Sequence, residues 1–145
     1  MKAEYSTVAK SQPAQVWQIF ADTASWPTWN GLVSGVEWID GPPTQAGSHF
    51  ILELSQPAFK LKATVKECAE PNRFAFSGNA MGVSLDCALD FTPQAEGSTL
   101  MTGAIELSGP AVFLINDDMK QRGVAVFAGW FEALKAESEK LVVAG

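Results

Sequence analysis

Residues 110–142 read PAVFLINDDMKQRGVAVFAGWFEALKAESEKLV and contain no proline after the first position. Ser108 and Gly109 come just before Pro110 and form a turn signal, so we predict a helix that begins at Pro110 and extends about 45 Å to Val142. One face of this helix carries Val112, Phe113, Gly123, Val124, Phe127, Trp130, Phe131, Leu134 and Leu141. A helix with such a stripe requires a broad apolar surface to cover.

The residues before this helix predict that surface as a set of β-strands. Apolar and polar side chains alternate along them, most clearly over residues 83–91. The predicted strands are 3–10, 36–40, 48–55, 58–69, 73–80, 83–91 and 98–107. A proline-capped helix at 13–20 and a compact turn or second short helix at 22–30 follow the first strand. This order predicts an α+β fold in which one curved, seven-stranded antiparallel sheet wraps on the C-terminal helix.

The composition fits one globular domain spanning residues 1–145. A net charge of −6 repels phosphate backbones, so we expect no nucleic-acid partner. Apolar runs are shorter than a membrane-spanning helix and the N-terminus lacks an apolar signal core, so we expect no membrane insertion and a cytoplasmic location.

No cofactor motif or metal-ligand spacing occurs in the sequence, so we expect neither a cofactor nor a bound metal. Cys68 and Cys87 lie in separate predicted strands and are expected to be buried free thiols.

Short motifs mark the boundaries of these elements. They are PAQVW at 13–17, WPTWN at 26–30, GSHF at 47–50, EPNRF at 70–74, and FTP at 91–93 ahead of GSTL at 97–100. In this order and spacing, over nearly its whole length, the chain resembles the helix-grip fold of the START, polyketide cyclase and birch pollen allergen superfamily (SRPBCC). The resemblance implies an internal cavity between sheet and long helix, which different relatives use to carry lipids, sterols or hormones, to cyclise polyketides or to serve chaperone-linked roles. Fold does not select among these functions.

The residues themselves also indicate a cavity. Gly123 lies on the inward stripe of the long helix, where it either leaves space or permits close packing on the sheet. Asn116 and Lys120 project near the centre of that stripe, which fits either a hydrated cavity mouth or a bent helix end from which Lys120 reaches solvent. Inward positions are rich in bulky side chains. The predicted ligand-binding residues are Tyr5, Trp29, Trp38, Phe50, Phe74, Phe76, Leu85, Cys87, Met101, Asn116, Lys120, Gly123, Phe127 and Trp130.

Catalytic groups are scarce in this sequence. His49, the only histidine, has the strand parity opposite to Phe50 and is predicted to face solvent. No nucleophile elbow or phosphate-binding loop occurs. Glu67 shares the parity of Ala63 and Val65, which predicts a carboxylate at the inner rim with a raised pKa. The weak candidates for proton transfer are Tyr5, Glu67, Asn116 and Lys120.

Three functions fit these residues. The first is binding or transport of a small hydrophobic molecule, such as a lipid, a sterol or a polyketide-like compound, in the cavity. The second is a polyketide cyclase, dehydratase or aromatase-like enzyme in which the cavity fixes the shape of the substrate and a candidate residue moves protons. The third is a chaperone-linked protein-interaction module that presents an exposed Trp26–Trp29 turn to a protein partner. The residues leave open whether the chain is an enzyme.

Overall fold

A computed structural model of the protein describes residues 2–31, 33–42, 45–55, 58–80 and 82–144, and it describes the backbone alone for 58–59 and 141–144. Along the chain its helices, strands and short 3-10 turns (η) are β1 (Lys2–Ala9), α1 (Pro13–Ala21), η1 (Thr23–Ser25), α2 (Trp26–Trp29), β2 (Val33–Asp40), β3 (His49–Ser55), β4 (Ala58–Ala69), β5 (Arg73–Ala80), β6 (Val83–Pro93), η2 (Ala95–Gly97), β7 (Thr99–Ser108), η3 (Val112–Leu114) and α3 (Asp117–Ala144). The predicted α+β order is confirmed. Within these residues no helix is both long and apolar enough to cross a membrane.

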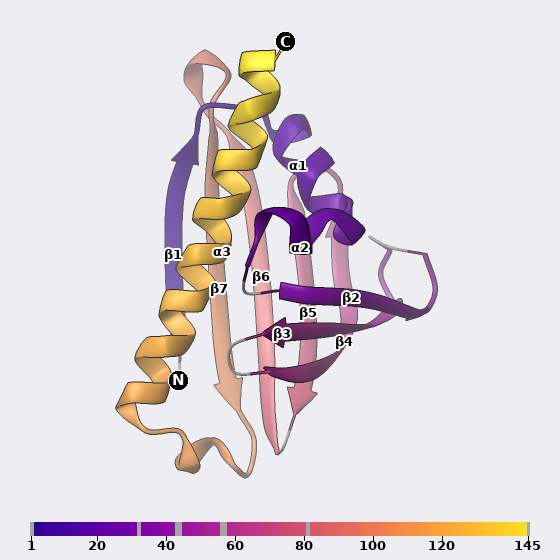
Figure 1. Ribbon diagram of the computed structural model, residues 1–145, viewed down its shortest axis with the longest axis vertical. Helices are drawn as coiled ribbons and strands as arrows, with labels where there is room; N and C mark the ends of the chain where they lie inside the picture. Colours follow the sequence, from indigo (N-terminus) through magenta and orange to yellow (C-terminus); the bar gives the residue numbers. More distant parts are fainter. Residues whose placement is uncertain (1, 32, 43–44, 56–57, 81, 145) are drawn as a thin grey trace.

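The strands form one antiparallel sheet in the order β1-β7-β6-β5-β4-β3-β2. From β2 to β7 each strand pairs with the next one along the chain, and β1 pairs with β7. Figure 1 shows that β1, β7 and β6 run along the molecule while β2, β3 and β4 cross it, so the sheet curls around one of its faces. Helices α1, α2 and α3 lie on that face, which we call the inner face.

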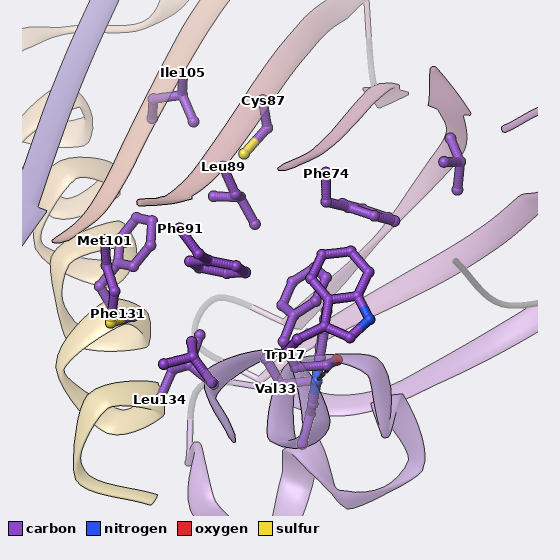
Figure 2. Close-up of a cluster of buried hydrophobic side chains, with 14 of the residues drawn as sticks. Trp17, Val33, Phe74, Cys87, Leu89, Phe91, Met101, Ile105, Phe131 and Leu134 are labelled. Carbon is purple, nitrogen blue, oxygen red and sulfur yellow. Dashed lines mark hydrogen bonds between the residues drawn. The ribbon is translucent and has the colours of Figure 1, made fainter. Parts of the chain in front are cut away.

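The closed part of the core lies where α1 and the second half of α3 meet the sheet. Figure 2 labels its side chains Trp17, Val33, Phe74, Cys87, Leu89, Phe91, Met101, Ile105, Phe131 and Leu134, all of them buried. Phe131 and Leu134 are the α3 residues of this set, and both are completely buried. Burial of each such side chain contributes about 1.5–3 kcal/mol to folding. The apolar stripe predicted for the long helix therefore packs as expected at Phe131 and Leu134, whereas the side chain of Leu141 lies outside the described residues.

Gly103 of β7 sets how closely α3 approaches the sheet. A Cβ atom added at Gly103 would collide with the rings of Phe131 and Phe127. Phe131 also stacks on Tyr5 of β1, with the ring centroids 5.9 Å apart. The missing side chain thus leaves a recess into which the helix places two aromatic rings.

Hydrogen bonds fasten the second half of α3 to the segment between β1 and α1. The buried hydroxyls of Ser138 and Ser11 lie 2.9 Å apart. The Thr99 hydroxyl donates to the carbonyl oxygen of Ser11 at 2.7 Å, and the backbone N–H of Lys10 donates to the Glu139 carboxylate at 2.7 Å. No hydrogen bond or ion pair between described residues joins positions 117–126 to the sheet. The helix is therefore anchored at its C-terminal half.

The long helix begins at Asp117 and not at the predicted Pro110. Residues 112–114 form the 3-10 turn η3, and the side-chain oxygen of Asn116 accepts a hydrogen bond from the backbone N–H of Met119 at 2.9 Å. Asparagine favours this capping position because its side chain satisfies a free backbone donor. Asp117 and Asp118 then place negative charge in the first helical turn, where the helix dipole favours it. The prediction that Asn116 lies on the inward stripe was wrong.

Candidate functional site

Rows of uncharged side chains, aligned across neighbouring strands, make up the inner face. One row consists of Trp38, Phe50, Ala63, Gly78, Leu85 and Leu107. The next row consists of Val65, Phe76, Cys87, Ile105 and Ala3. Because alternate residues of a strand point to opposite faces, the charged residues of these strands lie on the outer face. In the described part of the sheet, the inner face therefore carries no charged side chain.

Helix α3 leaves part of this inner face uncovered. Residues 121–125 are all exposed, and a Cβ atom added at Gly123 would find no atom within 4 Å. In Figure 1, α3 lies in front of β1 and β7, and no helix crosses the lower half of β6. The inward side chains that stay partly exposed here, together with two from α3, are Trp38, Leu52, Phe76, Leu85, Phe127 and Trp130. We call these six residues the open apolar surface.

The predicted ligand-binding residues divide into three groups in the structure. Those buried in the closed core are Phe50, Phe74, Cys87 and Met101. Those that remain partly exposed are Tyr5, Trp29, Trp38, Phe76, Leu85, Lys120, Phe127 and Trp130. Asn116 and Gly123 are exposed. Leu52 was missed, although its parity with Phe50 on β3 was a signal that it points inward.

Hydrogen bonds from indole N–H groups hold the tryptophans of this region in place. Trp38 donates a hydrogen bond to the Thr23 hydroxyl at 2.9 Å. The ring centroids of Trp38 and Phe50 lie 4.8 Å apart. Trp26 donates to the backbone carbonyl of Phe20 and is buried beneath the Trp26–Trp29 turn. The rings of Trp26 and Trp130 meet edge to face at 5.4 Å. The prediction that this turn exposes its tryptophans to a protein partner is wrong for Trp26, because its ring is needed to cover the core.

The hydroxyl of Tyr5 lies at the junction of β1 and α3. It donates a hydrogen bond to the Glu132 carboxylate at 2.8 Å, and the Tyr5 ring stacks on Phe131. The hydrogen bond to Glu132 raises the pKa of Tyr5, and burial and the negative charge of Glu132 raise it further. Tyr5 therefore stays protonated at neutral pH and ties the edge strand to the helix.

Glu67 lies on the outer face and not at the inner rim. A β-bulge between Val65 and Glu67 shifts the register, so Glu67 pairs with the outward residue Ala75. Its carboxylate accepts a hydrogen bond from Arg73 Nε at 2.8 Å, and Arg73 also binds Asp90. These hydrogen bonds, first that to Asp90 and then that to Glu67, raise the pKa of Arg73. The predicted position was wrong because one extra residue in a strand reverses the parity of those after it.

Two hollows among the described residues lie away from the open apolar surface. One of about 630 Å³ lies on the outer face and is lined by His49, Thr64, Ser77 and Asp86 among others. His49 faces outward as predicted, and its Nδ1 lies 3.1 Å from the Asp40 carboxylate. Another hollow, of about 420 Å³, lies between Pro13 and Pro93. Neither is the predicted cavity between sheet and helix. No group of three metal-binding side chains occurs among residues the structure describes.

Both cysteines are free thiols on the inner side of the sheet. Burial raises the pKa of Cys87 to about 12, and burial followed by the charge of Glu70 raises the pKa of Cys68. At pH 8 a pKa near 12 leaves about one Cys87 side chain in ten thousand as the thiolate.

In a Cys68→Ala variant, we expect Cys87 to resist an aromatic disulfide reagent until urea unfolds the protein. Complete labelling of the native variant within minutes would contradict the described burial of Cys87.

The sequence as a whole matches a known protein family. Residues 1–139 match the family described as polyketide cyclase/dehydrase and lipid transport. The chain belongs to this family. The match covers every strand and nearly all of α3, so the resemblance to the SRPBCC superfamily is confirmed. No curated protein matches the sequence significantly.

Solved structures share the fold of this polyketide cyclase/dehydrase and lipid transport family member. A hypothetical protein from Helicobacter pylori, jhp0584, superimposes with a TM-score of 0.81 at 15% identity, over 95% of this chain and 88% of that chain. A START superfamily protein from Mycobacterium smegmatis superimposes with a TM-score of 0.76 at 15% identity, over 97% of this chain and 98% of that chain. Ara h 8.0201 superimposes with a TM-score of 0.76 at 11% identity, over 95% of this chain and 97% of that chain. At these identities the likeness is one of fold.

Proposed function

We propose that this protein binds a small hydrophobic molecule against the open apolar surface, beneath the first half of α3. The observation that carries the proposal is the partial exposure of large apolar side chains on an uncharged inner face. Each Å² of apolar area removed from water contributes about 25 cal/mol, so a ligand that covers this area gains a favourable hydrophobic term, from which the entropy lost on binding is subtracted. Aromatic walls and few polar groups are typical of small-molecule sites.

The space beside Gly123 supports the proposed position of the ligand. Gly123 lies one turn before Phe127 on α3, and nothing lies within 4 Å of where its side chain would begin. A glycine inside a helix costs about 1 kcal/mol relative to alanine. Close packing on the sheet does not account for that cost here, since no sheet atom lies close to Gly123. The open space is therefore available to a ligand.

The enzymatic alternative has fewer groups to draw on. Glu67 lies on the outer face and Asn116 caps α3, so neither is positioned to reach a ligand on the inner face. The Tyr5 hydroxyl is already engaged in a hydrogen bond that it donates to Glu132. Of the four candidates for proton transfer this leaves Lys120, which lies on the first half of α3. Among the described residues no acid and base pair converges on the open apolar surface, which supports binding over catalysis.

Filling the space beside Gly123 tests this proposal. We expect the wild-type protein to bind the neutral dye N-phenylnaphthylamine with a rise in dye fluorescence, and dodecanol to displace the dye. The Gly123→Leu variant should bind both molecules about tenfold more weakly, because the new side chain occupies the ligand's space. Fluorescence titration measures both affinities.

A matched variant controls for effects of the added leucine on the helix itself. Ala125 is exposed and lies on the opposite side of α3 from Gly123, so Ala125→Leu is expected to leave both affinities unchanged. Failure of the wild-type protein to bind either molecule would overturn the proposal. Equal affinities in the wild type and Gly123→Leu would also overturn it.

A further inference from the structure

Lys120 introduces a positive charge opposite an uncharged surface. It lies seven residues before Phe127 and eleven before Phe131, about two and three helical turns, so it shares their side of α3. Phe131 lies against Gly103 of β7, which shows that this side of the helix faces the sheet. Lys120 is half-buried, whereas the residues at 116–119 and 121–125 are exposed. Its side chain is therefore directed toward the inner face.

The ammonium group of Lys120 has no carboxylate partner within the described residues. Arg122, two positions later, forms an ion pair with Asp118 at 3.0 Å on the solvent side of the helix. Lys120 belongs to none of the described ion pairs. A cation in the first turn of a helix is disfavoured by the helix dipole, so local helix stability does not explain its presence. The charge is free to pair with a ligand.

Distances along α3 match an amphipathic molecule. About 10 Å of helix separates Lys120 from Phe127, and Gly123 between them leaves the intervening space open. A ligand whose apolar part covers Phe127 and the inward side chains of the sheet would extend past Gly123 toward Lys120. Its polar end would meet a cation and no anion from the inner face.

We infer that Lys120 binds the anionic head group, a carboxylate, sulfate or phosphate, of an amphipathic ligand whose apolar part lies on the open apolar surface. This inference rests on the proposed function, because it requires a hydrophobic molecule beneath the first half of α3. A charge-assisted contact of this kind discriminates between ligands that share one apolar chain and differ only in the charge of the head group.

Dodecanoate and dodecanol form such a pair, and displacement of N-phenylnaphthylamine measures the affinity of each. Replacing Lys120 with methionine keeps the apolar stem and removes the charge. We expect Lys120→Met to weaken dodecanoate binding about tenfold and to leave dodecanol binding unchanged. The matched control is Arg122→Met, which removes the same charge from the solvent side of the same turn. We expect it to change neither affinity.

The outcomes separate this inference from the proposed function. If the wild-type protein binds neither molecule, the proposed function fails and the inference fails with it. If both molecules bind but Lys120→Met weakens them equally or not at all, only the role of Lys120 is overturned. If Arg122→Met weakens dodecanoate as much as Lys120→Met does, the preference comes from the overall charge of the helix, which also overturns the inference.

Discussion

Replacing Phe131 with alanine is expected to lower the free energy of unfolding by about 3–5 kcal/mol. Phe131 is fully buried, and its ring centroid lies between 5.1 and 5.9 Å from those of Tyr5, Phe127 and Trp130. Alanine would leave a cavity where α3 lies on Gly103. The surrounding side chains belong to a sheet and a helix that are fixed by other contacts, so the cavity would close only in part. Urea unfolding followed by tryptophan fluorescence measures the loss.

Phe113 provides the matched control for this prediction. It is the same residue type, lies in η3 and is 79% exposed. Phe113→Ala is expected to change the free energy of unfolding by less than about 0.5 kcal/mol. Similar losses in the Phe113 and Phe131 variants would contradict the described packing, because they would place both rings in comparable surroundings.

Gly103→Ala is expected to lower the free energy of unfolding by about 2 kcal/mol, since the added methyl group would overlap the rings of Phe131 and Phe127. The rings or the whole helix must move to make room. The same change at Gly123 meets no atom within 4 Å. Gly123→Ala is therefore expected to raise the free energy of unfolding by up to about 1 kcal/mol through helix propensity.

The two glycine variants are informative together because their expected changes in the free energy of unfolding have opposite signs. Urea unfolding of both variants against the wild type gives the two changes under the same conditions. A loss of stability at both positions would mean that the first half of α3 also packs against the sheet. A gain at both would mean that α3 does not approach β7 at Gly103.

Much of the inner face was predictable because side-chain parity is a local property of a strand. The alternation predicted over residues 83–91 places Cys87, Leu89 and Phe91 on one face of β6, and all three are buried. Ser84 and Asp86, on the other parity, are exposed. The second half of the long helix was predictable for a similar reason, since its apolar stripe has the helical period.

Two candidate residues were misplaced because local interactions compete with periodicity. Asn116 continues the helical pattern in sequence, but its side chain caps the backbone N–H of Met119, and the helix begins after it. Glu67 continues the parity of β4 until a bulge after Val65 reverses it. A bulge depends on how β4 pairs with β5, and a window of one strand contains no information about that pairing.

The sequence by itself determined the type and order of the elements and which faces are apolar, because these depend on the spacing of residues close together in the chain. Only the tertiary structure decided which inward side chains are sealed and which stay open. That outcome depends on the recess at Gly103, which receives Phe127 and Phe131, and on the contact of Ser138 with Ser11 in the segment after β1. These contacts fix the later part of α3 and leave residues 121–125 exposed. These contacts join residues far apart in the chain, so no local pattern encodes them.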